Sequence, residues 1–466
     1  MKRRLPLVLA VVLSAGSAHA QDAHLEQRIR DLEIRSEKLP SPPEPIPEGG
    51  LGLDVWFKDG LHIATSDGAV DLRIGGYVIH HSAFRIRNGE RYGADTFEIE
   101  EAHLEVHAKL WKRWEVFVAP NLLPGSAGLH DGWVEFNGWD LVRVRAGQFR
   151  VPHSQESREP TLWQDFPEDS LLVPQAPERD LGVMVHGLLF DGICDYAVGI
   201  FNGNGSDDLA DNGDENSDKD VVGYLGISPF ATTGWDLLRH FRLGFGATDG
   251  RQNKVPDETP FELESPAAGR LYTDNAIVKR AAAPQVVVDG ERRRYVGEMA
   301  LGLGPFDLKT EYAYSTHEIE IGGDDDIFRS FGNNWSVGWW FGGTRASGNR
   351  PKVNKGLFDG GYGALQVVAR YSKMHTSNEY VLDGGFGGTN HVREWAAGVN
   401  WYPTSFVRIS VMYQNVEYGD DGVPVESVSA GGPKRGPGMG GGGPGTEASK
   451  SVTEEDLLII RVQIEF

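Results

Sequence analysis

The sequence is poor in cysteine, in long apolar runs and in positive charge. Cys194 is the only cysteine among 466 residues, so no intramolecular disulfide can form. After the first 20 residues no run of about 18 apolar residues occurs, which excludes a transmembrane helix. Lys and Arg number 45 against 67 Asp and Glu, a formal net charge of −22. This balance argues against nucleic acid as a partner.

The first segment, MKRRLPLVLAVVLSAGSAHA, has the composition of an export signal. It starts with basic residues, continues with an apolar stretch and ends in Ala-His-Ala. We therefore expect residues 1–20 to be a signal peptide that is cleaved before Gln21. An exported chain without a transmembrane helix can still span a membrane, as a closed β-barrel.

Residues 21–39 have the apolar spacing of a short coiled coil. Leu25, Ile29 and Leu32 fall at a and d positions, with charged residues around them. A coiled coil here would join several copies of the chain; a solvated amphipathic helix is the alternative, because little more than two heptads are marginal alone. Residues 40–50 contain five prolines, which indicates a stiff linker.

From residue 51 onward we predict an all-β fold. Apolar and polar residues alternate, as in the closing segment LLIIRVQIEF, so one face of each strand is apolar and the other polar. We count about 16 such segments, an even number as bacterial barrels require. The prediction for 51–466 is a transmembrane antiparallel β-barrel of about 16 strands, preceded by the short coiled-coil helix. The expected strands lie near 69–84, 96–110, 114–121, 130–137, 140–149, 181–190, 193–202, 220–227, 239–248, 291–303, 305–316, 334–343, 363–373, 393–403, 405–418 and 456–466.

The connections between these strands alternate in length. Short turns fall on one side of the barrel, and two longer connections, 228–238 and 344–362, are exceptions on that side. Tryptophans gather at the short-turn ends, as an aromatic girdle at a membrane interface would. They are Trp111, Trp114, Trp139, Trp235 and Trp401. The long, polar connections fall on the other, outer side: 85–95, 150–180, 203–219, 249–290, 317–333, 374–392 and the Gly-rich 419–455.

Arginines recur on the polar faces of the strands, where they would line the lumen. A guanidinium keeps its charge and offers a planar fork to oxyanions, so we interpret these arginines as pore-lining and anion-binding. They are Arg73, Arg143, Arg145, Arg242, Arg370, Arg408 and Arg461, together with Arg158 and Arg179 in the connection 150–180.

The strand FEIEEAHLEVHAKL also admits a metal site. His103 and His107 alternate with Glu101 and Glu105 on one face. A water-facing lumen wall needs polar residues in any case, so we expect no metal and no cofactor. The sequence contains no Gly-x-Ser-x-Gly motif, and we expect no enzymatic activity and no catalytic residue.

Three segments resemble the phosphate-selective porin O and P family. They are VRVRAGQFRVPHSQESREPTLWQDFPEDSLLVPQAPERDLGV at 142–183, YAVGIFNGNG at 196–205 and WAAGVNWYPTSFVRISVMYQ at 395–414. The resemblance implies a sixteen-stranded outer-membrane barrel, usually a homotrimer. It also implies an inward constriction loop at 150–180 and an arginine-lined lumen that passes phosphate or polyphosphate anions.

The sequence departs from that family at acidic positions. Glu100 and Glu101 stand where paired arginines are common, and 150–180 has seven carboxylates against three arginines. Carboxylates in a narrow pore favour cations. Because loop carboxylates surround Arg143, Arg145, Arg158 and Arg179, we expect these arginines to be paired, and a paired guanidinium attracts an anion less than a free one does. We therefore expect selectivity to be weak or mixed. A weakly selective or cation-tolerant porin and a structural barrel tethered to the cell wall are the alternatives. The loop carboxylates concerned are Glu156, Glu159, Glu168 and Asp169.

Phe466 ends the chain on the apolar face of the last strand. It looks like the residue by which outer-membrane barrels are recognised by the barrel assembly machinery. The expected surroundings are outer-membrane lipid and lipopolysaccharide, with small anionic solutes inside the lumen.

Overall fold

The computed structural model describes the chain from residue 52 onward, with gaps. The described residues are 52–87, 90–91, 95–123, 128–139, 141–173, 176–203, 217–256, 272–273, 286–321, 323–344, 350–376, 387–388, 391–419, 423–424 and 451–466. The expected signal peptide, coiled coil and linker lie outside these residues. Leu53–Phe466 forms one compact unit.

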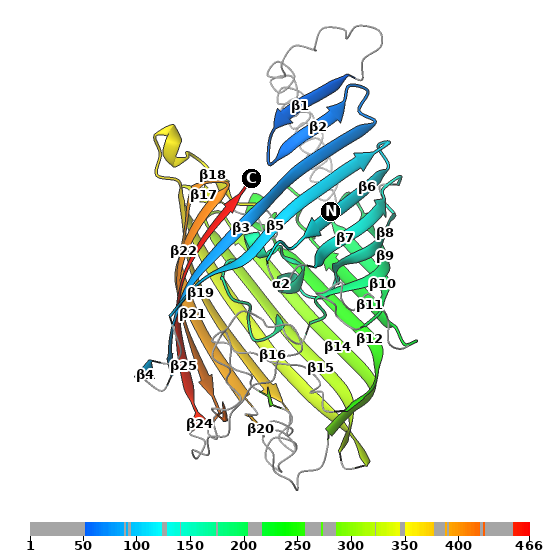
Figure 1. The fold of residues 1–466 in the computed structure, drawn as a ribbon, viewed down its shortest axis with the longest axis vertical. Helices are drawn as coiled ribbons and strands as arrows, with labels where there is room; N and C mark the ends of the chain where they lie inside the picture. The colour runs from blue at the N-terminus through cyan, green and yellow to red at the C-terminus, as the bar shows by residue number, and fades with distance from the viewer. Residues whose placement is uncertain are drawn as a thin grey trace, which may run out of the picture. The chain divides into compact units, whose positions relative to one another are not determined.

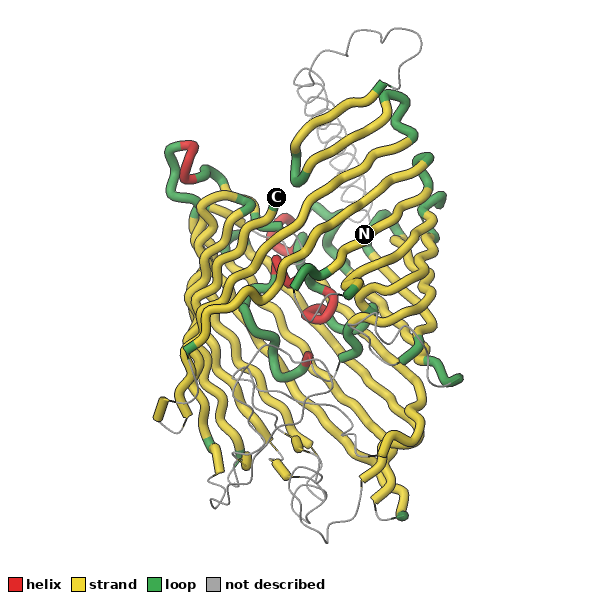
Figure 2. The backbone as a smooth tube through the Cα atoms, in the orientation of Figure 1, coloured by secondary structure: helices red, strands yellow, loops and turns green. Residues whose placement is uncertain are grey.

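Sixteen antiparallel strands form a closed barrel, which confirms the predicted fold class and strand number (Figures 1 and 2). The last strand pairs with the first, Glu455–Glu465 running opposite Arg87–Tyr77, so the described sheet closes on itself. The strands are β3 (Val70–Arg87), β5 (Thr96–Leu110), β6 (Trp114–Pro120), β7 (Leu129–Phe136), β8 (Arg143–Arg150), β9 (Arg179–Leu189), β10 (Cys194–Phe201), β11 (Asp220–Ile227), β12 (Arg242–Pro256), β14 (Val286–Leu303), β15 (Phe306–Ile321), β16 (Asp324–Phe341), β19 (Ala364–Thr376), β21 (His391–Thr404), β22 (Val407–Tyr418) and β25 (Glu454–Glu465).

The alternation in the sequence sets the two faces of each strand. In β25, Leu458 and Ile464 are exposed on the outside, whereas Arg461 and Gln463 are buried inside the barrel. At the short-turn end Trp111 is 67% exposed, in keeping with a ring that contacts a membrane interface. None of the helices among the described residues is long and apolar enough to cross a membrane.

Several strands are longer at the outer end than the sequence pattern indicated. The connection expected at 317–333 is wrong: β15 continues to Ile321 and β16 starts at Asp324, and the two pair along this length. Beyond the lipid both faces of a strand meet water, so the apolar alternation that marks a membrane strand fades there. Short strands continue this outer region. Strand β4 (Glu90–Arg91) pairs with the end of β3, β13 (Tyr272–Thr273) pairs with β20 (Gly387–Gly388), and β23 (Val423–Pro424) pairs with β24 (Ser451–Val452).

A hairpin that the sequence pattern does not predict precedes the barrel. It consists of β1 (Leu53–Phe57) and β2 (Leu61–Thr65), and β2 pairs with β3 from Ala64↔Asp71 to Leu61↔Ile74. Strand β2 therefore pairs with the part of β3 that lies beyond the end of β25, whose last pair with β3 is Glu465↔Tyr77 (Figure 1). The connection between β16 and β19 contains a further strand pair and a short helix, β17 (Gly343–Thr344), β18 (Lys352–Val353) and η5 (Leu357–Asp359), and the connection between β11 and β12 contains η4 (Asp236–Leu238).

Candidate functional site: an arginine-lined cavity under the loop between β8 and β9

The connection from β8 to β9 lies inside the barrel. It contains α2 (Gln155–Arg158) and η1 (Thr161–Trp163), drawn in red among the strands in Figure 2. Leu162 packs against Tyr77 and Ile79 of β3, and Phe166 packs in a buried cluster on β19, β21 and β22. These apolar contacts hold the loop to the inner wall.

Three arginines expected to line the pore lie buried beneath this loop. Arg370 donates to the carbonyl oxygens of Glu168 at 2.9 Å and Asp169 at 3.0 Å. Arg408 donates to the carbonyl oxygen of Gln164 at 2.5 Å. Arg461 lies 3.4 Å from the carbonyl oxygen of Pro167 and is fully buried, like Arg408. These contacts fix the loop to the inner wall. A buried guanidinium requires hydrogen-bond acceptors, and the loop carbonyl oxygens supply them.

The loop carboxylates also contact the inner wall. Glu156 accepts hydrogen bonds from the backbone N–H of Ser170 at 2.9 Å and from Asn334 of β16 at 3.1 Å. Glu159 forms an ion pair with Lys309 of β15 at 3.0 Å. Asp169 accepts from Gln164 at 3.0 Å and stays exposed. Glu156 and Glu159 therefore contact the wall formed by β15, β16 and β19.

Burial changes the protonation of this loop, which lies outside the spanning strands. It raises the pKa of Glu156 to about 7 and the pKa of Glu168 to about 8. Burial also lowers the pKa of His153 to about 3, so this histidine is neutral. The nearby carboxylate of Asp169 adds to the rise for both glutamates.

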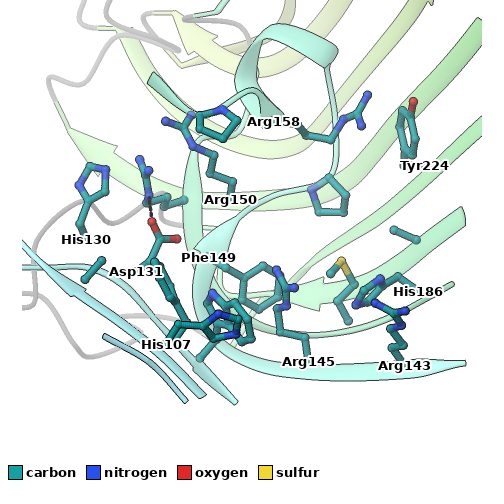
Figure 3. Close-up of a pocket in the computed structure, with 18 of the residues that line it drawn as sticks. His107, His130, Asp131, Arg143, Arg145, Phe149, Arg150, Arg158, His186 and Tyr224 are labelled. Carbon is teal, nitrogen blue, oxygen red and sulfur yellow. Dashed lines mark hydrogen bonds and ion pairs between the residues drawn. The ribbon is translucent and has the colours of Figure 1, made fainter. Parts of the chain in front are cut away.

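A cavity of about 630 Å³ lies between the loop and the wall formed by β5–β11. It is lined by arginines from β8, from the loop and from β9. Figure 3 shows these arginines on two sides of the cavity: Arg150 and Arg158 lie in the upper part of the view, and Arg143 and Arg145 lie below. The arginines of its lining are Arg143, Arg145, Arg150, Arg158 and Arg179, and the carboxylates are Glu105, Asp131 and Asp195.

Three of these arginines are paired with carboxylates of the barrel wall. Arg145 contacts Glu135 of β7 at 2.7 Å. Arg158 contacts Glu298 of β14 at 2.6 Å, and Arg179 contacts Asp131 of β7 at 3.1 Å. The expectation that Glu156, Glu159, Glu168 and Asp169 pair with them was wrong. Glu156 and Glu159 contact β16 and β15, Glu168 lies 4.0 Å from His81 of β3, and Asp169 is exposed.

Two cavity arginines have no such pairing. Arg150 donates to the carbonyl oxygen of Ser157 at 2.8 Å and to the hydroxyl of Thr161 at 3.1 Å, both neutral acceptors. Arg143 forms no ion pair with any carboxylate in the part of the chain that the structure describes. Arg150 was missed as a site residue, although it follows Gly-Gln-Phe directly in the segment that carried the family resemblance.

The two remaining predicted arginines are held in pairs nearer the ends of strands. Arg73 contacts Glu105 at 2.7 Å. Arg242 contacts both carboxylate oxygens of Asp195 at 2.6 Å. In the described residues no group of three or more His, Cys, Asp or Glu is arranged to hold a metal ion.

A closed sixteen-stranded barrel with a charged loop folded against its inner wall is the architecture of a porin. The chain belongs to the phosphate-selective porin O and P family, whose sequence profile matches residues 74–432. It is therefore an outer-membrane channel for small solutes, and its family and fold are those of channel proteins rather than enzymes. A search of curated protein sequences finds no significant match.

Several solved structures align with this chain at low sequence identity. OmpF of Salmonella typhi, in complex with daunomycin, aligns with a TM-score of 0.51 and 8% identity, covering 89% of this chain and 100% of that one. An anion-selective porin from Comamonas acidovorans aligns with a TM-score of 0.50 and 10% identity, covering 85% and 100%. OmpT of Vibrio cholerae, in a trimer form, has a TM-score of 0.49 and 9% identity, covering 85% and 99%.

Proposed function

We propose that this porin prefers small oxyanions, phosphate among them. The observation that carries the proposal is Arg143, a cavity-lining guanidinium without an ion-pair partner among the described carboxylates. Such a group keeps its full attraction for a passing anion, whereas a paired guanidinium has lost much of it. Arg150, which is bound only to neutral acceptors, adds a second such charge.

The position of the loop carboxylates supports the same sign of selectivity. Glu156 and Glu159 are engaged on β15 and β16, away from the cavity arginines. The family's description as phosphate-selective and the anion selectivity of the Comamonas acidovorans porin agree with this proposal. A weakly selective or cation-tolerant pore is the alternative, favoured by the exposed carboxylates of Glu100 and Asp169.

The test is a reversal potential in a planar bilayer. With a potassium chloride gradient across the membrane, an anion-preferring pore gives a zero-current potential whose sign reports chloride permeation, and the same sign is expected with potassium phosphate. A potential of the opposite sign would favour the cation-tolerant alternative. Absence of conductance in correctly inserted protein would favour a structural barrel.

We also propose that the exported protein assembles as a homotrimer through the wall β6–β8. These strands have seven, eight and eight residues, fewer than the roughly 9–11 that a tilted strand needs to cross the hydrocarbon core. Strands β10 and β11 also have eight residues each, but β6–β8 are three short strands in succession. A short wall is better covered by neighbouring protein than by lipid, and it carries exposed apolar residues such as Val118 and Val134. The lipid-facing remainder would contact lipopolysaccharide in the outer leaflet.

A further inference from the structure

A row of aromatic side chains crosses the wall of the cavity. Phe117 of β6 lies opposite Trp133 of β7 in the strand register, and their ring centroids are 5.5 Å apart. His107 of β5 lies opposite Phe117 with a centroid distance of 6.0 Å. Porin lumens are polar as a rule, so aromatic rings in contact with the solute space need a separate physical explanation.

The strand next to this row covers one part of the tryptophan ring and leaves another part open. Trp133 lies opposite Gly147 of β8, whose φ is 130°, and a Cβ at Gly147 would come within 2.2 Å of the carbonyl oxygen of Gly132. No side chain therefore covers the ring from that position. The guanidinium of Arg145 lies 3.9 Å from the centre of the Trp133 ring, so apolar surface and positive charge adjoin.

The other side of the cavity repeats this combination. Arg158 lies 3.9 Å from the ring centre of Tyr224, and the loop contributes Pro160 and Leu162 to the lining. Phe117 and Trp133 both remain partly exposed, although Trp133 also packs against the buried cluster around Phe149. A volume of about 630 Å³ is in the range of sites that hold small organic molecules, and it exceeds what a phosphate ion requires.

We propose that the cavity binds organic anions with a planar apolar body, of which aromatic carboxylates are the simplest. The carboxylate binds to Arg143, and the ring packs against Phe117 and the part of Trp133 that Arg145 leaves uncovered. Aromatic pairing adds to the charge attraction that acetate or phosphate receives, so the ring increases affinity and residence in the cavity. This inference rests on the proposed anion preference and specifies which anions are held longest.

The experiment measures block of the chloride current in planar bilayers by benzoate, acetate and phosphate added separately. Benzoate and acetate present the same carboxylate, so their difference isolates the ring. We expect a half-blocking concentration roughly tenfold lower for benzoate than for acetate. In Trp133→Ala the benzoate-to-acetate ratio falls toward one, whereas in Trp235→Ala, whose exposed ring lies outside the cavity lining, the ratio stays at the wild-type value.

Equal block by benzoate and acetate in the wild-type pore would overturn the inference. If the reversal potential still shows anion preference in that case, the proposed function stands and only the organic-anion specificity fails. A cation-preferring reversal potential would instead overturn the proposed function itself. Should Trp133→Ala fail to insert, Phe117→Leu keeps an apolar side chain on β6 and is measured in the same way, with an unchanged ratio counting against the inference.

Discussion

Arg370 of β19 and Glu394 of β21 form a buried ion pair beneath the inward loop. Nε and Nη2 of Arg370 donate to one carboxylate oxygen of Glu394 at 2.8 and 2.6 Å, and neither side chain is exposed. The same guanidinium donates to two loop carbonyls, so this pair couples the barrel wall to the loop.

Replacing Arg370 by Ala should therefore release the loop. The change removes its donors to the loop and leaves Glu394 buried without its charge partner, which costs about 3–5 kcal/mol. We expect noisier single-channel currents and faster proteolysis within 151–178, with a milder effect in Arg370→Ala/Glu394→Gln, where no buried charge remains. Loop cleavage at the wild-type rate in the single variant would contradict this role.

The attachment of the loop should weaken as pH rises. Burial raises the pKa of Glu156 from 4.5 to about 7, so the docked loop binds a proton that the released loop loses near pH 4.5. Docking is then strongest below about pH 4.5 and loses this contribution as pH rises through about 7. Current noise between pH 5 and pH 9 measures the effect. Glu156→Gln, which imitates the protonated group, should reduce the pH dependence and leave the part that comes from Glu168, and an equally steep profile would exclude Glu156 as a source.

Removing Phe466 should lower the amount of assembled barrel. Its backbone N–H and carbonyl exchange hydrogen bonds with Gly76 at 3.0 Å, which completes the closure of β25 on β3. We expect less heat-modifiable protein in the outer membrane at unchanged export, whereas Phe358→Ala, an exposed phenylalanine in η5, should assemble normally. Normal assembly of the truncated chain would show that Phe466 is not the assembly signal.

Deleting residues 21–50 should weaken a trimer only modestly. A seam of about two heptads contributes little beside contact between barrel walls. Native electrophoresis in mild detergent compares the deletion with the full mature chain, and most of the trimer should survive. Complete conversion to monomers would show that the segment before the barrel makes the main contact.

The membrane strands could be predicted from the sequence because lipid on one side and water on the other impose a two-residue alternation. Segments without this difference between their two faces were missed. The outer part of β16, with Asp324 and Asp326, meets water on both faces and has no such alternation. The β1–β2 hairpin was missed because it precedes the repeating strands, although Asp59 and Gly60, both with positive φ, stand at its turn.

The arginines of the site could be proposed from their polar faces, but their partners could not. Arg158 meets Glu298, which is 140 residues away in the sequence, and this pairing depends on where the loop docks. Burial of Arg408 and Arg461 depends on the same docking, since without the loop both would face the lumen. A strand pattern shows which face a residue occupies, and the contacts across a barrel follow from its closure and from the loop.

The reversal potential of Arg143→Ala, measured beside the wild type and Arg143→Lys under the same salt gradient, tests the proposed anion preference most directly. We predict an anion-preferring potential in the wild type, a shift toward cations in Arg143→Ala, and a value close to wild type in Arg143→Lys, which keeps the charge. A wild-type potential of cation-preferring sign, or the same potential in all three proteins, would contradict it.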